Sequence, residues 1–398
     1  MTVTFVYLSN GVKSIIMVNK IRQLFILTGA CCLVCSSALA QSPSGRTVRI
    51  RILEKARAAN VRTNTPGEVQ CFGGGEKISG TRNLKTVIAV YNDVFLLGKK
   101  KLSCPRIFIK ASGSGVITVN GRRFTGGILL VKTDPGHFSV INYADLEDYI
   151  KGVLYHEVSH YWPSEVLKAQ AIVSRSFALY QMRENAGKDF DLTNDIYSQV
   201  YGGKTSERYR TSKAVDNTAG CVLTYRDKIF PAYYHSTCGG YTENVLSLWN
   251  MDCAPLAGGP CNFCKDSPHF SWHTVIPVDE AAEKLRKAGF AVPSIKDITL
   301  SGRDKSGRVT QVTVITDAGE VLISSKDFRN ILNPNVVRST NFSVRVDEHD
   351  LVFTGTGWGH GVGMCQWGAY FMGKQGYTFE QILNYYYPGA EIHEHYGT

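Results

Sequence analysis

The hydrophobic pattern of this chain changes its period near residue 145, and this change constrains the fold more than any other feature. Before it, short apolar runs alternate with polar residues, as they do in half-buried strands, and Asn120-Gly121 is typical of a hairpin turn. After it, apolar residues recur every three or four positions. The order predicts an α+β protein of mixed helices and antiparallel strands that begins with a small β domain.

The expected elements follow from this pattern and from residues that start or stop helices. A helix is expected over residues 145–159, and a second starts at Pro163, a residue favoured at the first helical position, and ends at Gly187. A turn is expected at Lys305-Ser306-Gly307. The expected strands are 48–53, 86–90, 106–109, 117–121, 127–132, 138–141, several within 215–242, two or three within 297–325, and 351–354; further helices are 279–289 and one near 379–386.

Residues 1–40 have the pattern of a secretory signal peptide. A basic start at Lys20 and Arg22 precedes an apolar stretch, and Ala38-Leu39-Ala40 offers small residues at the cleavage positions. A buried N-terminal helix is the alternative, but no amphipathic period follows the apolar stretch. We therefore expect export to the periplasm or the cell wall. No later apolar run approaches the roughly 18 residues of a membrane span, so no transmembrane helix is expected in the mature chain.

Charge adds a weaker constraint. Without residues 1–40 the net charge falls from +10 to +7, because that segment holds three basic residues and no acidic ones. A basic exported protein suits a polyanionic neighbour such as a cell wall or a membrane surface. Nucleic acid would also attract it, but export argues against nucleic acid as a partner.

Cysteine usage points to a structural cluster. Of the 11 cysteines, four lie close together, at Cys238, Cys253, Cys261 and Cys264. In an exported protein such a cluster usually forms disulfides. The same four, or three of them with His235, could instead hold a tetrahedral zinc ion. Both interpretations stay open, and neither requires a cofactor for catalysis.

Three longer segments and two shorter ones carry a recognisable pattern. They are LEDYIKGVLYHEVSHYWPSEVLKAQAIVSRSFALY (146–180), AYYHSTCGGYTENVLSLW (232–249), GTGWGHGVGMCQWGAYFMGKQGYTFEQILNYYYPGAEI (355–392), DIYSQVYGG (195–203) and VRSTNFSV (337–344). In this order they resemble the stage II sporulation protein D / LytB family (SpoIID domain) of peptidoglycan-acting proteins. The resemblance covers roughly residues 45–392.

The resemblance implies a domain plan and an activity. Residues 41–140 would be an N-terminal β-rich part, and residues 141–395 a SpoIID-like catalytic domain with a substrate groove and a β-rich insertion at about 275–345. Studied members of the family are lytic transglycosylases that cut glycan strands, preferably without stem peptides. The implied reaction cleaves the MurNAc–GlcNAc β-1,4 bond and leaves 1,6-anhydro ends, in cell-wall remodelling such as sporulation.

Two other functions stay open. Some relatives are described only as enhancers of wall amidases, so a non-catalytic, wall-binding enhancer of an N-acetylmuramoyl-L-alanine amidase is the alternative, and an amidase is a possible partner. A cysteine hydrolase that uses Cys238 or Cys365 with a histidine has the residues but lacks a recognised pattern.

Glu157 stands at the position of the family's catalytic glutamate. Cleaving a glycosidic bond needs a proton on the leaving oxygen, which a partly buried carboxyl with a raised pKa can supply. Most glycosidases use two carboxylates. A lytic transglycosylase can use one, because the 6-hydroxyl of the muramic acid is the nucleophile and the same carboxylate can accept its proton. Tyr155-His156 and Val158 depart from the proline and methionine that commonly flank this glutamate in the family.

The resemblance also implies a set of substrate-binding residues. Arg175 could hold a sugar carboxylate bidentately or pair with a core carboxylate. His235 could orient the sugar or Glu157, or tie loops together in the core. Tyr386 could stack on a sugar. The full set is Gln170, Arg175, His235, Ser236, Gly240, Gly357, His360, Gly361, Gln366 and Tyr386.

Two features limit what can be carried over from the family. The glycine-rich block 355–368 lacks the lysine and serine of a phosphate-binding loop, so we expect a tight loop that presents His360 and Gln366 to a groove. Clostridial relatives carry a zinc site on cysteine and histidine in the region corresponding to about 190–202. This chain has neither residue there, so that site does not carry over.

Overall fold

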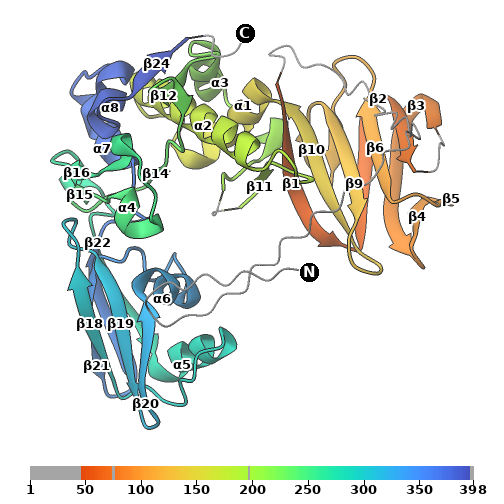
Figure 1. The fold of residues 1–398 in the computed structure, drawn as a ribbon. Coiled ribbons are helices and arrows are strands. Elements are labelled where there is room, and N and C mark those ends of the chain that lie inside the picture. The colour runs from red at the N-terminus through yellow and green to blue at the C-terminus, as the bar shows by residue number, and fades with distance from the viewer. Residues whose placement is uncertain (1–45, 74–76, 196–197, 395–398) are drawn as a thin grey trace, which may run out of the picture. The chain divides into compact units, whose positions relative to one another are not determined.

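The computed structural model describes residues 46–73, 77–195 and 198–394 (Figure 1). The expected signal peptide at residues 1–40 lies outside these residues and stays a prediction. None of the described helices is long and apolar enough to cross a bilayer. Helices and several separate sheets occur together, which confirms the predicted α+β class.

The elements alternate between strand-rich and helix-rich stretches. The helices are α1 (Leu146–Glu157), α2 (Ser164–Glu184), α3 (Tyr209–Asp216), α4 (Val245–Trp249), α5 (Val278–Lys287), α6 (Ser325–Leu332), α7 (Gln366–Lys374) and α8 (Phe379–Tyr386). The strands up to the second helix are β1 (Thr47–Ala56), β2 (Ala58–Phe72), β3 (Lys77–Tyr91), β4 (Val94–Leu97), β5 (Lys100–Leu102), β6 (Arg106–Ala111), β7 (Ile117–Val119), β8 (Arg122–Phe124), β9 (Gly127–Lys132) and β10 (Phe138–Asp145). The later strands are β11 (Leu192–Thr193), β12 (Val222–Tyr225), β13 (Lys228–Ile229), β14 (Tyr234–His235), β15 (Tyr241–Thr242), β16 (Gly259–Pro260), β17 (Ser271–Pro277), β18 (Asp297–Arg303), β19 (Val309–Thr316), β20 (Gly319–Ser324), β21 (Phe342–Asp347), β22 (Asp350–Thr356), β23 (Met364–Cys365) and β24 (Glu391–His393).

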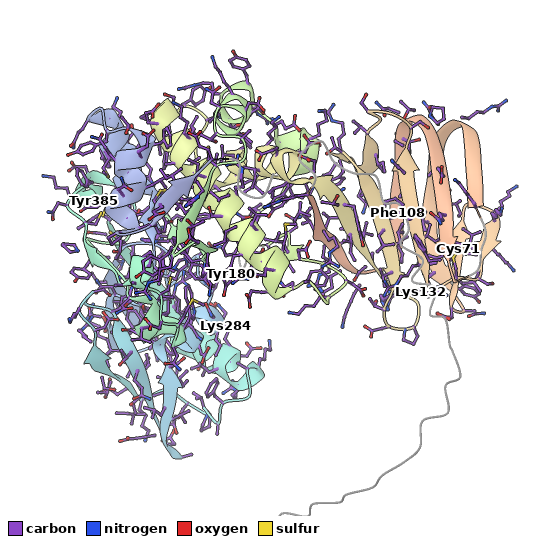
Figure 2. All side chains as sticks on the ribbon, turned by 45° about the horizontal axis from the view of Figure 1, so that its top comes forward. Cys71, Phe108, Lys132, Tyr180, Lys284 and Tyr385 are labelled. Atoms are coloured by element: carbon purple, nitrogen blue, oxygen red, sulfur yellow. A yellow bond between two sulfur atoms is a disulfide. The ribbon has the colours of Figure 1, made fainter. Side chains whose placement is uncertain are left out.

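The first ten strands and β11 form one sheet, whose order along the main path is β11-β1-β10-β9-β6-β2-β3-β4-β5. Asn120 and Gly121 take φ values of 48° and 86°, as a type I′ hairpin turn requires, so the predicted hairpin is present. The sequence pattern missed β2, because the register shifts on both sides of Pro66 interrupt its alternation. A disulfide that was not predicted joins Cys71 in β2 to Cys104 (Figure 2).

The helix α1 follows β10 without a loop, because Asp145 ends the strand and caps the helix. Its carboxylate accepts hydrogen bonds from the backbone amides of Glu147 and Asp148, at 2.8 and 3.4 Å. The buried face of α1 packs into the same core as the sheet. The helix ends at Glu157, because Val158 takes an extended conformation with φ of −140°. The sheet and the cap thus fix the position of Glu157.

Two expectations in the central region are corrected. Pro163 is the N-cap of α2, with an extended ψ of 142°, and the first helical residue is Ser164. The range 215–242, within which several strands were expected, begins with the end of the short helix α3. Only three buried residues mark the inner face of α3, which is too few to show a period in the sequence.

A parallel pairing joins two of the motif-bearing segments. In β14 and β23, Tyr234 lies opposite Met364, and His235 lies opposite Cys365. The loop after β14 is therefore adjacent to the start of α7, although more than a hundred residues separate them in the chain. This pairing positions the site described below.

Residues 271–356 form two three-stranded sheets, β17-β22-β21 and β18-β19-β20, with α5 and α6 packed against them (Figure 1). The turn predicted at Lys305-Ser306-Gly307 is present, with Gly307 at φ of 80°. The short helix α6 and strand β21 were not predicted. The division of the chain into domains stays a prediction.

Candidate active site

Glu157 ends α1 as a half-buried residue with three hydrogen-bond partners. Burial raises the pKa of its carboxyl to about 7, while hydrogen bonds from the Tyr234 hydroxyl, the Val200 amide and the Gln366 carboxamide oppose this rise. None of these partners is a carboxylate. A carboxyl that keeps its proton near neutral pH can protonate a leaving group there.

A chain of hydrogen bonds directs the Tyr234 hydroxyl toward Glu157. The Gln199 amide donates to the Tyr234 oxygen at 3.0 Å, and the Gln199 carbonyl accepts from Tyr149 at 3.0 Å. Since Tyr234 accepts from Gln199, its own proton is free for Glu157. Burial raises the pKa of both phenols well above the usual value, so both remain neutral.

Gln366 and Gln170 form the other side of this network. The Gln366 amide donates to the Gln170 carbonyl at 3.3 Å, and the Gln170 amide donates to the Ser174 hydroxyl at 3.1 Å. Because an amide nitrogen carries two protons, Gln366 can serve Gln170 and Glu157 at once. Of the predicted site residues, the structure thus brings Glu157, Gln170 and Gln366 together.

Sequence reasoning missed Tyr149, Gln199, Val200 and Tyr234. All four lie within the segments that carry the family pattern. Tyrosine and glutamine are common in cores and at surfaces, so residue type alone does not single them out. The pairing of β14 with β23 brings Tyr234 close to Gln366. The segment that carries Gln199 and Val200 is held against α1, where the Gly202 amide donates to the Gly152 carbonyl at 3.0 Å.

The rings of His235 and His360 lie next to each other, and neither histidine is among the hydrogen-bond partners of Glu157 within the described residues. Successive side chains of a strand point to opposite faces, so His235 points away from the side on which Tyr234 meets Glu157. Its Nδ1 lies 3.1 Å from the Val362 carbonyl, and its ring centroid lies 5.6 Å from that of His360. Burial lowers the pKa of His360 to about 3 and that of His235 well below its usual value. Both rings are neutral, and these contacts favour the alternative in which His235 ties loops together.

The contacts of Arg175 also favour its structural alternative. Its guanidinium is bidentate to the Glu147 carboxylate, with both N–O distances at 2.7 Å, and donates to the Cys221 carbonyl at 2.8 Å. The side chain is 1% exposed. It therefore ties α1 to α2 and has little capacity left to bind a sugar.

The predicted glycines shape the loops beside the site. Gly240, Gly357 and Gly361 take positive φ values of 105°, 79° and 88°. A Cβ on Gly361 would lie 2.5 Å from the Arg308 guanidinium, so this position needs glycine for space as well as for conformation. The Ser236 carbonyl accepts from the Trp367 amide at 3.0 Å, which fixes the loop after β14 against α7.

Partly exposed aromatic residues come shortly after Glu157 and Gln366 in the sequence. Trp162 comes five residues after Glu157, and Trp367 comes directly after Gln366. Their ring centroids lie 5.2 Å apart, and Tyr370 lies 5.0 Å from Trp162. Half-buried aromatic faces of this kind suit stacking on the apolar face of a sugar.

The thiol cluster differs from the predicted one. Four buried cysteines, Cys238, Cys261, Cys264 and Cys365, place their sulfur atoms within 4.8 Å of one another. Cys365 takes the place expected for Cys253 or His235, because the β14–β23 pairing brings it to the loop that holds Cys238. All four are free thiols, as is Cys253, which is only half-buried.

Tyr386 belongs to this thiol cluster. Its hydroxyl lies 3.3 Å from the Cys261 sulfur, and the side chain is buried. A sugar cannot stack on a buried ring, so its predicted role is not supported by its position.

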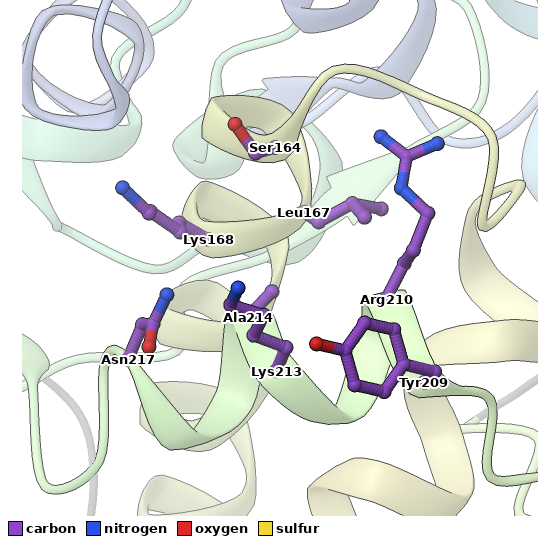
Figure 3. Close-up of a pocket in the computed structure, with 8 residues that line it drawn as sticks. All are labelled: Ser164, Leu167, Lys168, Tyr209, Arg210, Lys213, Ala214 and Asn217. Atoms are coloured by element: carbon purple, nitrogen blue, oxygen red, sulfur yellow. The ribbon is translucent and has the colours of Figure 1, made fainter.

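A separate pocket of about 600 Å³ lies between α2 and the α3 region (Figure 3). None of the predicted site residues lines it. Lys168, Arg210 and Lys213 make its wall basic, although Lys168 is paired with Glu165 at 2.8 Å. The residues that line it are Ser164, Leu167, Lys168, Tyr209, Arg210, Lys213, Ala214 and Asn217.

Comparison with known proteins identifies two family segments and several relatives. Residues 134–225 match the model of a stage II sporulation protein (SpoIID), and residues 262–363 match a domain of unknown function (DUF8618). An uncharacterised protein of Brachyspira hyodysenteriae is 34% identical over 69% of this chain and 73% of its own length. The stage II sporulation protein D of Bacillus subtilis is 31% identical over 63% of this chain and 74% of its own length. A Bacillus subtilis amidase enhancer is 25% identical over 61% of this chain and 40% of its own length.

Proposed function

Because the chain belongs to the stage II sporulation protein D family, we propose that it acts on the bacterial cell wall as an exported peptidoglycan lytic transglycosylase. Its substrate would be the MurNAc–GlcNAc β-1,4 bond of glycan strands, preferably stripped of peptides. The observation that carries the proposal is the state of the Glu157 carboxyl. Burial raises its pKa to about 7, and its three hydrogen-bond partners are the neutral groups of Tyr234, Val200 and Gln366.

In the first step, the protonated Glu157 gives its proton to the glycosidic oxygen as the bond between that oxygen and the muramic acid C1 breaks. Positive charge develops at C1, and the leaving sugar departs with a hydroxyl. The proton transfer leaves a carboxylate at Glu157. Hydrogen bonds from Tyr234, Val200 and Gln366 stabilise that carboxylate, because each donates to it.

In the second step, the muramic acid 6-hydroxyl attacks C1 and gives its proton to the Glu157 carboxylate. A 1,6-anhydro ring closes, and Glu157 is again protonated for the next cycle. Atoms balance without water, which explains how one carboxyl can do the work that hydrolytic glycosidases divide between two. Trp162 and Trp367 would hold the sugar rings beside this carboxyl.

Two features support the proposed setting outside the cytoplasm. Disulfides persist in oxidising compartments, and Cys71 is bonded to Cys104. The chain without residues 1–40 is also basic, with a net charge of +7, which suits the polyanionic cell envelope. A wall amidase is a candidate partner, since one relative is named as an amidase enhancer.

The test is digestion of peptide-stripped glycan strands by the mature protein and by Glu157→Gln, with products read by mass spectrometry. We expect anhydro-ended fragments from the wild type and none from the variant. Glu184→Gln is the matched control, because Glu184 ends the neighbouring helix, is exposed, and forms a surface ion pair with Arg183.

Other outcomes would redirect the proposal. Fragments that carry water would make the protein a hydrolase. If neither protein cleaves, while both bind sacculi and stimulate an amidase equally, the enhancer function replaces the transglycosylase.

A further inference from the structure

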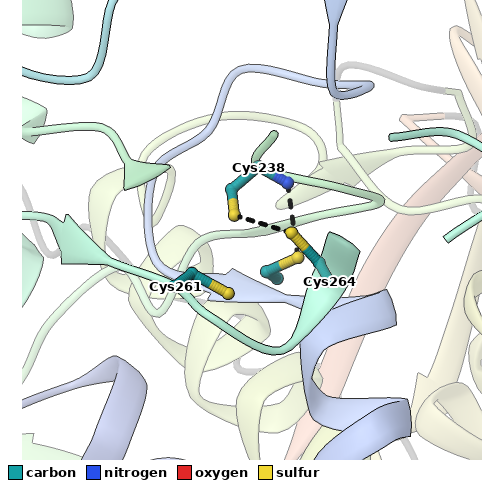
Figure 4. Close-up of side chains that lie close together, drawn as sticks. Cys238, Cys261 and Cys264 are labelled. Atoms are coloured by element: carbon teal, nitrogen blue, oxygen red, sulfur yellow. Dashed lines mark hydrogen bonds between the residues drawn. The ribbon is translucent and has the colours of Figure 1, made fainter. Parts of the chain in front are cut away.

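The four-cysteine cluster is assembled from three separate parts of the chain. Cys238 lies in the loop after β14, Cys261 and Cys264 form a C-x-x-C pair, and Cys365 ends β23 and caps α7. Figure 4 shows Cys238, Cys261 and Cys264 with their sulfur atoms pointing toward one another. The four sulfur atoms all lie within 4.8 Å of one another, and all four residues are buried.

The spacing of the sulfur atoms fits a shared cation better than disulfides. The Cys238 and Cys264 sulfurs are 3.4 Å apart, well beyond the roughly 2.0 Å of a disulfide. A tetrahedral zinc ion with Zn–S bonds of about 2.3 Å holds its four sulfurs roughly 3.8 Å apart. Burying four thiols together without a cation gains little, because the S–H group is a weak donor.

We infer that Cys238, Cys261, Cys264 and Cys365 form a structural zinc site with four thiolate ligands. Four protein ligands close the coordination sphere, so the ion would have no open position for substrate or water. Soft thiolate ligands in a tetrahedral arrangement select zinc over magnesium or calcium. The zinc assignment does not rest on the proposed glycan cleavage, and either proposal can fail without the other.

Neighbouring donors would offset the negative charge of four thiolates around one divalent ion. The Cys365 sulfur accepts from the backbone amides of Cys238 and Gly368, both at 3.3 Å. The Tyr386 hydroxyl lies 3.3 Å from the Cys261 sulfur. The buried guanidinium of Arg308 donates to the Cys238 carbonyl at 3.0 Å. Such surrounding contacts orient metal ligands and tune the metal site.

The site would hold together the loops that carry the candidate active site. Cys365 directly precedes Gln366, which donates to Glu157, and Cys238 follows the strand that carries Tyr234. An ion bound to both cysteines would fix these two partners of Glu157 relative to each other. This explains why cysteine stands at position 365, where a small polar residue would serve to cap α7 alone.

The first test measures zinc in untagged protein, by elemental analysis and by native mass spectrometry. We expect one zinc per chain, and none after Cys264→Ser or Cys365→Ser. Cys253→Ser is the matched control, because Cys253 is free but lies outside the cluster; it should retain the ion. Zinc-free wild type, or a Cys253→Ser variant that loses zinc, would overturn the assignment.

A second test uses the wild type alone, so that it does not depend on variants that fail to fold. Alkylation followed by peptide mapping should label Cys221 and Cys253 readily and should label the four cluster cysteines only after a chelator is added. Replacement of zinc by cobalt should give the charge-transfer and visible bands of tetrahedral thiolate coordination. Two disulfides within the cluster, found by mapping without reduction, would contradict the proposal.

Discussion

The hydrogen-bond network around Glu157 and the cluster of four cysteines meet at adjacent residues, Gln366 and Cys365. Both clusters are buried, but they differ in how their ionisable groups are compensated. In the carboxyl network, burial opposes ionisation of Glu157, and neutral donors limit that effect without cancelling it. In the thiol cluster, four like groups converge, and a cation would join them. The carboxyl network thus holds a reactive group at a cost in stability once the pH exceeds the pKa of Glu157, whereas the thiol cluster and its ion would stabilise the loops around them. Mutations should therefore separate activity from stability.

The largest expected effect is on activity. Glu157→Gln removes the only proton donor and acceptor of the proposed reaction, so glycan cleavage should fall by at least about 10³-fold. The rate of anhydro-product formation measures it. Glu184→Gln should cleave as the wild type does. If Glu157→Gln kept more than a tenth of wild-type activity, Glu157 would not be the proton donor.

The next effect concerns stability. Cys264→Ser should lower the thermal midpoint by roughly 10 °C, because loss of a bound structural ion removes several kcal/mol of folding free energy. Cys253→Ser, outside the cluster, should change it by less than about 2 °C. Differential scanning calorimetry measures both. Equal shifts in the two variants would show that the four thiols have no special structural role.

A third effect has the opposite sign to that of the cysteine substitution. The pKa of Glu157 is about 7 in the fold against an ordinary value of 4.5, so the folded state keeps a proton that the unfolded chain releases. Its stabilising contribution is complete below pH 4.5 and is lost as pH rises through about 7. Glutamine cannot ionise, so Glu157→Gln should be more stable than the wild type above this window, by up to about 3 kcal/mol.

Urea unfolding below and above this pH window measures that difference. The two proteins should be similar in stability at the low pH and should diverge as pH rises. Parallel stability curves would mean that burial does not raise the pKa of Glu157.

The smallest expected effect concerns the activity of a Tyr234 variant and tests whether Tyr234 stabilises the Glu157 carboxylate. Tyr234→Phe removes a donor that lowers the pKa of Glu157, so that pKa should rise further above its usual value. The high-pH limb of the activity profile should move to higher pH, and activity at the optimum should fall roughly tenfold, since the carboxylate formed in the reaction is less stabilised. Tyr233→Phe is the control, and its profile should match that of the wild type.

Sequence was sufficient for part of the site, although it missed Tyr149 on α1 and Tyr234 on β14. The fold class, the helix that ends at Glu157, and the positions of Gln170 and Gln366 followed from periodicity and from the family pattern. Glu157 was singled out by the family pattern, and the helix expected over residues 145–159 ends at Glu157, two residues earlier than expected. The roles of these residues in catalysis remain predictions.

Contacts between distant segments could not be predicted. Cys365 is 101 residues beyond Cys264, so no spacing pattern links it to the C-x-x-C pair; only the β14–β23 pairing does. The Cys71–Cys104 disulfide was missed for the same reason, because it depends on where β2 lies in the sheet. Arg175 and Tyr386 carry chemistry suited to sugar binding, but burial against Glu147 and Cys261 was not visible in the sequence.

The central claim is that Glu157 alone moves the protons and that water takes no part. The most direct measurement digests peptide-stripped glycan in water enriched in ¹⁸O and determines the mass of the new reducing ends. We expect anhydro ends that carry no ¹⁸O, and no new ends at all with Glu157→Gln. Incorporation of one ¹⁸O at each new end would show that water is the nucleophile and that the protein is a hydrolase.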